Sequence, residues 1–417
     1  MVHQVELGAG KAVYRRRFVR TQSFLSDGAA DQLPQEALQE GEPSGLRGGL
    51  ANTAMVYHGG RLLCLEEGSK PWEVSLPSLE TKGRFTFDGA LRHNFTAHPK
   101  VCPVTGELMF FGYGDHHVAG SDAFIHYSVA SRNGQLVRTV PVHFRKPVMT
   151  HDMAITQNYS ILLDFPFWDM SKPTRAEDKT RIGVLPRHAE SEQDAMWFEA
   201  PGQYGYHVAN AWEKASAMDE APDSGTFGQI IIELVLVSDM DFVFSKRGDS
   251  RLRLFALDLS CGQLLDNRVL CDLPCEFPVV DPRRVGLPTR YIWASRYAEG
   301  AKEVLAFDGV LRHDLHTCET QQLALPGGRR GGEVQFVPRR RSEGRGKEGD
   351  GYLLVLTSML SGASELLVLD AALSEPPIAI VSLPLRVPFG FHSLWLDAEE
   401  YREPTEADGA PARISKL

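Results

Sequence analysis

The chain has 417 residues, of which 43% are hydrophobic and 24% are charged, and its formal net charge is −10 at pH 7. The apolar fraction is enough for a sizeable core, while the negative charge argues against general nucleic-acid binding, which needs clustered lysine and arginine. No apolar run reaches the roughly 18 residues that a membrane-spanning helix requires.

From its start, the chain alternates between short strand-like runs and turns. Residues 53–67 contain two such runs around Gly59-Gly60, and residues 125–142 turn at Asn133-Gly134, a strong hairpin signal. The same design recurs at residues 98–114, 252–270, 303–325 and 351–385. Because helical periodicity is scarce, the pattern predicts an all-β fold, and at this length a β-propeller fits better than a sandwich.

Three polar stretches interrupt this pattern and are predicted to be loops: residues 25–49, 212–228 and 338–351. The last is basic and glycine-rich, and we interpret it as a solvated insertion in preference to an anion-binding or membrane-surface site. No stretch has the composition of an interdomain linker, which predicts a single domain over residues 1–417. The six cysteines include no CxxC pair and are typical of free thiols in a reducing compartment.

Four of the 14 histidines share one context, in or beside a strand-like run with small, apolar or aromatic neighbours: His98, His151, His207 and His392. For any one of them, a hydrogen-bonded core histidine is the ordinary interpretation. A buried imidazole must satisfy both ring nitrogens, and four can do so together by directing one nitrogen each towards a shared metal ion. Imidazole suits Fe, Zn, Cu and Ni. Since the inner strands of a propeller all face its axis, histidines far apart in sequence can meet there.

The segments around these histidines resemble the carotenoid cleavage oxygenases, and most closely the plant-type carotenoid cleavage dioxygenases. The similarity extends from Met1 almost to the C-terminus. It is carried by the motifs NTAMVYHGGRLLCLEEG, FTAHPKVCPVTGELMFFGYG, RIGVLPRH, ANAWE, CEFPVVD and VPFGFHSLWL. The resemblance implies a seven-bladed β-propeller with a loop and helix dome over an axial Fe(II).

The resemblance also implies roles for individual residues. The four histidines would bind Fe(II), and Glu67, Glu276 and Glu333 would accept the other ring N–H of the ligands. An edge-strand glutamate facing water is the alternative for each of the three. Thr53 would lie near one of the two open iron positions. The implied reaction uses O₂ as co-substrate to cleave a conjugated C=C bond of a carotenoid or apocarotenoid, giving two carbonyl products.

Aromatic side chains are expected to line the substrate tunnel, although ordinary core packing is at least as good an interpretation for any one of them. The candidates are Phe165, Phe167, Trp168, Phe389 and Phe391. Contact of the tunnel entrance with a membrane surface is a further expectation from the resemblance.

The match departs from the family pattern in three places. Relatives carry a segment that leads into MVHQVEL, so Met1 is expected to fall inside a blade and the first blade to be incomplete. A targeting signal is not visible, which leaves a cytoplasmic or plastid location. The region between Glu213 and Phe242 is divergent.

The third departure, at Glu66, bears on the substrate. Stilbene-cleaving relatives have a lysine immediately before the first of the three glutamates and a tyrosine upstream. Here that position is Glu66, and no tyrosine lies between Tyr14 and Tyr57. We therefore place stilbenoid cleavage second to carotenoid cleavage. The same fold could also serve as an inactive propeller that acts as a binding module, or as a trans-to-cis isomerase.

Overall fold

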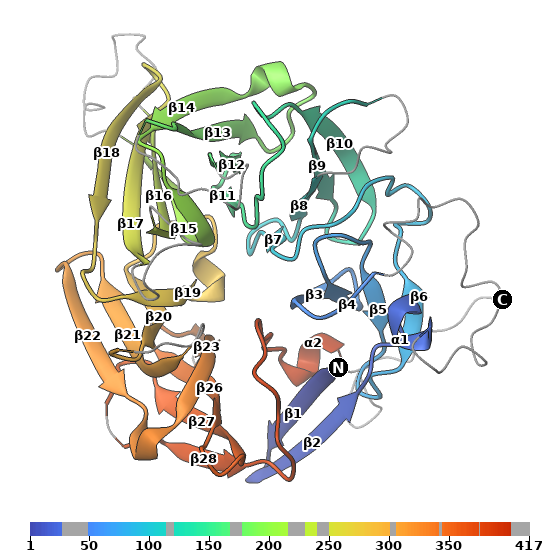
Figure 1. Ribbon diagram of the computed structural model, residues 1–417, viewed down its shortest axis with the longest axis vertical. Coiled ribbons are helices and arrows are strands. Elements are labelled where there is room, and N and C mark those ends of the chain that lie inside the picture. The colour runs from blue at the N-terminus through green and yellow to red at the C-terminus, as the bar shows by residue number, and fades with distance from the viewer. Residues whose placement is uncertain are drawn as a thin grey trace.

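The computed structural model describes residues 1–26, 49–113, 121–166, 177–215, 230–239, 250–300, 306–341, 344–374 and 376–401. Within these ranges the fold is almost entirely antiparallel β, and the sheets follow one another around a common axis (Figure 1). The predicted all-β propeller is confirmed. No helix in the described residues is long and apolar enough to cross a bilayer.

Four sheets of four strands form the first part of the ring. In chain order their strands are β3 (Ala54–His58), β4 (Arg61–Leu65), β5 (Trp72–Val74) and β6 (Thr81–Arg84); β7 (Lys100–Val101), β8 (Leu108–Tyr113), β9 (Ile125–Ala130) and β10 (Leu136–Val142); β11 (Ala154–Ile155), β12 (Tyr159–Asp164), β13 (Thr180–Pro186) and β14 (Met196–Ala200); β15 (Tyr204–Ala215), β16 (Ile230–Asp239), β17 (Arg251–Asp258) and β18 (Gln263–Val269).

An eight-stranded sheet follows and divides into two four-stranded blades, between which the strand pairing is limited to Phe307 and Gly331. Its strands are β19 (Cys275–Val279), β20 (Tyr291–Tyr297), β21 (Phe307–Asp314) and β22 (Glu319–Ala324), then β23 (Arg330–Pro338), β26 (Gly351–Ser358), β27 (Ser364–Asp370) and β28 (Ala379–Ser382).

The remaining blade is the hairpin of β1 (Val2–Gly8) and β2 (Lys11–Arg17), which pair only with each other within the described residues. That Met1 falls inside an incomplete blade stays a prediction. Outside the blades, the described ranges contain the short hairpin of β24 (Arg340–Arg341) and β25 (Gly344–Arg345), helices α1 (Gln22–Ser26) and α2 (Ala398–Tyr401), and the 3₁₀ turns Glu192–Asp194, Pro282–Arg284 and Pro326–Gly328.

Local sequence explains the hairpins. Gly59 and Gly60, between β3 and β4, have φ of 57° and 78°, the left-handed conformation that a tight hairpin turn requires and that glycine adopts at least cost. The turn between β9 and β10 has Gly134 at φ 78°.

The core lies between neighbouring blades. The clusters of buried apolar side chains combine residues from adjacent blades, as Leu63 of β4 does with Phe110 of β8. Trp293 of β20 is fully buried against Phe336 of β23, with ring centroids 4.6 Å apart, and its indole N–H donates to the carbonyl of Ala371. Burial of such interfaces holds successive blades at a fixed angle and so fixes the positions of their inner ends.

The three predicted loops differ in part from the structure. Residues 25 and 26 are the end of α1, and residues 27–48 lie outside the described ranges. Residues 212–215 are the end of β15, because Trp212 is buried and its indole N–H donates to Glu233 of β16 at 2.8 Å. Residues 216–229 lie outside the described ranges. The predicted loop 338–351 contains β24 and β25, and Arg339 and Arg340 form ion pairs with nearby aspartates.

Candidate metal centre

Four histidines from four blades meet at the propeller axis. His98 and His151 lie just before the inner strands β7 and β11, His207 is in β15, and His392 is in the segment after β28. Their ligand nitrogens all lie within 4.8 Å of one another, and within the described part of the chain no other histidine, cysteine or carboxylate group clusters in this way. The arrangement brings together all four histidines singled out from the sequence.

The pKa shifts, hydrogen bonding and spacing of the histidine rings are compatible with metal binding. Burial, followed by the neighbouring charge of His392, holds the pKa of His98 and of His207 well below the usual histidine value, so both rings are neutral. Nε2 of His207 is buried and has no hydrogen-bond partner. Nε2 of His98 is 2.8 Å from Nε2 of His151, close to the ~3 Å expected for imidazoles in neighbouring positions around one ion.

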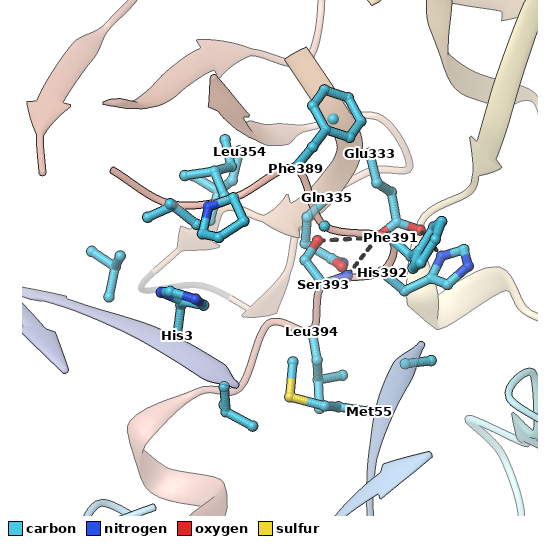
Figure 2. Close-up of a pocket in the computed structure, with 18 of the residues that line it drawn as sticks. His3, Met55, Glu333, Gln335, Leu354, Phe389, Phe391, His392, Ser393 and Leu394 are labelled. Atoms are coloured by element: carbon cyan, nitrogen blue, oxygen red, sulfur yellow. Dashed lines mark hydrogen bonds and ion pairs between the residues drawn. The ribbon is translucent and has the colours of Figure 1, made fainter. Parts of the chain in front are cut away.

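Three glutamates hold three of the rings. Nδ1 of His207 is 2.6 Å from Glu276 and Nδ1 of His392 is 2.9 Å from Glu333 (Figure 2), while His151 pairs with Glu67. A carboxylate that accepts the Nδ1 proton leaves the Nε2 lone pair directed to the axis. None of the three is therefore an edge-strand glutamate facing only water.

Burial raises the pKa of Glu276 to about 7, because an ionised carboxylate is poorly solvated at this depth. A nearby cation is the usual compensation for such a group. The carboxylate is further fixed by the Phe277 N–H, which donates to it at 2.5 Å.

Bulges on the inner strands direct these side chains to the axis. The register of β19 shifts between Glu276 and Val279, where Phe277 has φ 53°, and that of β23 shifts between Gly331 and Val334. The register of β15 shifts on both sides of Val208, next to His207. A bulge re-aims a side chain that a regular strand would present to a sheet face, so glutamates and histidine reach one point from three different blades.

Two tyrosines complete the surroundings of His151. The Tyr113 hydroxyl donates to Glu67 at 2.6 Å, and the Tyr206 ring stacks on His151 with centroids 4.0 Å apart. Burial and the Glu67 carboxylate raise the pKa of both hydroxyls, so both keep their protons. The sequence interpretation missed both, and the only signal was their place beside motifs already identified, in FFGYG and before His207.

Thr53 contacts the histidine cluster through its backbone. Its carbonyl accepts the His392 N–H at 3.2 Å, while its hydroxyl bonds to Asn52. Its predicted place near an open metal position stays a prediction, and what the structure shows is a role in holding the His392 segment.

A cavity of about 270 Å³ opens beside the centre, between β1, β23 and β26. Figure 2 shows Glu333, Phe391 and His392 grouped on one side of it and His3 on the other. Phe389 and Phe391 line this cavity, as the tunnel interpretation expects.

Of the other aromatic candidates, the structure describes only Phe165, which does not line this cavity. Phe165 is instead buried in the core between blades, 5.2 Å from the Tyr204 ring. Phe167 and Trp168 lie outside the described residues.

Comparisons with known proteins agree with this geometry. The family model described as retinal pigment epithelial membrane protein matches residues 1–397. Carotenoid 9,10(9',10')-cleavage dioxygenase 1 of Arabidopsis thaliana is 32% identical over 97% of this chain and 81% of its own. Isoeugenol monooxygenase of Pseudomonas putida is 29% identical over 83% and 75%. The crystal structure of Pseudomonas brassicacearum lignostilbene dioxygenase superposes with a TM-score of 0.76 at 24% identity, over 93% of this chain and 85% of that one, and so has the same fold.

Proposed function

Because the chain belongs to the family of the retinal pigment epithelial membrane protein and the carotenoid cleavage oxygenases, we propose that it is an Fe(II)-dependent dioxygenase. Its reaction is the cleavage of a conjugated C=C bond of a carotenoid or apocarotenoid by O₂, with two carbonyl products. The observation that supports this best is the convergence of four imidazoles, three of them held by carboxylates, beside a mostly apolar cavity.

The chain's own residues have three tasks in this reaction. His98, His151, His207 and His392 hold the metal through nitrogens within 4.8 Å of one another. The glutamates fix the tautomers and supply negative charge that balances the cation. Phe389 and Phe391 offer an apolar wall on which a polyene can lie. The ferrous ion, when bound, supplies the O₂ chemistry that protein side chains lack.

Metal content tests the proposal most directly. We expect about one iron per chain after anaerobic loading with Fe(II), and loss of that iron in His151→Ala. The matched control is His313→Ala, which removes an equally buried imidazole outside the cluster and should keep its iron. A stoichiometric zinc, or no metal in the wild-type protein, would favour a binding module over an oxygenase.

Cleavage of a stilbenoid or phenylpropenoid is the second candidate, supported by the isoeugenol monooxygenase relative. Against it stands Glu66, a carboxylate that cannot pair with a phenolate. Incubation of the iron-loaded protein with an apocarotenal, with resveratrol and with isoeugenol separates the two. We expect aldehyde products from the apocarotenal only. Turnover of the phenols alone would reverse the assignment.

We propose that the apolar substrate enters the cavity from a membrane or micelle surface. Phe389 and Phe391 are 46% and 48% exposed, so they are available both to the cavity and to such a surface. Co-sedimentation with phosphatidylcholine vesicles should fall for the Phe389→Ser/Phe391→Ser variant. Equal sedimentation of variant and wild type would contradict this contact.

A further inference from the structure

A largely buried ion pair lies next in sequence to two of the metal-site histidines. Lys100 of β7 places Nζ 2.7 Å from Oδ1 of Asp152, whose side chain is only 2% exposed. Lys100 follows His98 by two residues, and Asp152 immediately follows His151. The pair therefore joins the chain segments of two of the four histidines, which come from neighbouring blades.

Asp152 also reaches a third blade. Its Oδ2 accepts the backbone N–H of Val208, next to His207, at 2.8 Å. Val208 lies where the register of β15 is shifted on both sides, so this contact fixes the bulge that presents His207. Oδ1 accepts the Met153 N–H at 2.6 Å as well, so both carboxylate oxygens are engaged.

Among the four histidines, His98 depends most on contacts that hold its chain segment in place. The other three rings are each held by a glutamate, whereas no carboxylate of the described residues bonds to the His98 ring. The His98 segment is held by two other contacts. Its backbone N–H donates to Thr96 Oγ1 at 3.0 Å, and Lys100 anchors it to Asp152.

We propose that Lys100 and Asp152 are positioning residues of the metal centre, which set the geometry of His98, His151 and His207 without touching the metal. The inference rests on the proposed function, since it concerns the same metal site. A buried pair of this kind costs desolvation, which well-packed apolar residues would avoid. Its contacts to three ligand-bearing segments give a reason for its presence that stability alone does not.

The test compares Lys100→Met, Asp152→Asn, the double variant and the conservative Lys100→Arg. Fe(II) affinity is measured by anaerobic competition with a chromophoric chelator, and site geometry by the visible absorption spectrum of the Co(II)-loaded protein. We expect each single charge-removing variant to bind Fe(II) about 10-fold to 100-fold more weakly and to change the Co(II) spectrum. Lys100→Arg should recover most of the affinity. The matched control is Glu365→Gln, which breaks the buried pair with Arg329 away from the axis.

The control separates positioning from stability. A lower melting temperature in both Asp152→Asn and Glu365→Gln, with altered affinity and spectrum only in Asp152→Asn, supports the proposal. Wild-type affinity and spectrum in Lys100→Met and Asp152→Asn would overturn it and leave the iron site intact. A variant that fails to fold is replaced by the double variant, which removes both charges and leaves neither ion unpaired. Absence of metal binding in the wild type overturns the proposed function and this inference together.

Discussion

Replacement of Glu276 gives the sharpest test of how the carboxylates act. Oε2 of Glu276 accepts from Nδ1 of His207 at 2.6 Å and from the Phe277 N–H at 2.5 Å, in a side chain only 7% exposed. Glu276→Gln keeps an oxygen acceptor in place and removes the charge. A hydrogen bond to a charged group contributes about 1.5–3 kcal/mol and a neutral one about 0.5–1.5 kcal/mol. The difference of about 1–1.5 kcal/mol corresponds to roughly 5-fold to 12-fold weaker Fe(II) binding.

Glu276→Ala removes both hydrogen bonds and leaves two buried donors unsatisfied, each of which costs about 1–3 kcal/mol. We therefore expect weaker metal binding together with a lower free energy of unfolding. Anaerobic chelator competition measures the first and urea unfolding the second. Glu213→Gln is the matched control, because Glu213 also accepts a backbone N–H, that of Asn158, in a network separate from the histidines. If Glu276→Gln bound Fe(II) within twofold of the wild type, the charge-based reasoning would be refuted.

Four further predictions address other parts of the molecule. Tyr113→Phe removes the donor to Glu67, and we expect about 1 kcal/mol, or roughly fivefold, weaker Fe(II) binding by chelator competition; unchanged binding would mean that this hydroxyl does not hold Glu67. Trp293→Ala empties a fully buried site between blades and should lower the free energy of unfolding in urea by about 3–5 kcal/mol. A loss below about 1 kcal/mol would be inconsistent with the packing described. Phe389→Ala should raise KM for an apocarotenal several-fold with kcat within twofold, and a fall in kcat alone would place this ring at the reacting bond instead. Removal of iron by a chelator should lower the melting temperature of the wild type, since metal at 100 times Kd contributes about 2.7 kcal/mol, and should leave His151→Ala unaffected.

Much of the fold could be predicted from local patterns. Hairpins such as β3–β4 and β9–β10 are encoded by short apolar or alternating runs and by glycines at the turns, so they need no tertiary information. The end of β15 could not be predicted in this way. Residues 212–215 begin a mostly polar stretch that is typical of a loop. Only the partner strand β16 supplies the packing and the hydrogen-bond acceptor that extend β15 into it.

The residues of the candidate site also differ in how far they could be predicted from sequence. Four histidines in apolar settings could be identified from sequence because burial of so many imidazoles demands a shared partner. Glu67, Glu276 and Glu333 came from the family resemblance, and the structure shows which ring each one holds. Their roles as metal-site residues stay a prediction until iron is measured.

The sequence by itself determined the residue types, the strand and turn pattern and the family. The tertiary structure decided which groups meet: Tyr113 with Glu67, Thr53 with the His392 backbone, and Asp152 with both Lys100 and the Val208 N–H of two other blades. These contacts depend on bulges and on the angle between packed blades, which sum many weak interactions between residues far apart in the chain. A local stretch of sequence does not contain these long-range interactions. The contacts between blades could therefore be identified only in the tertiary structure.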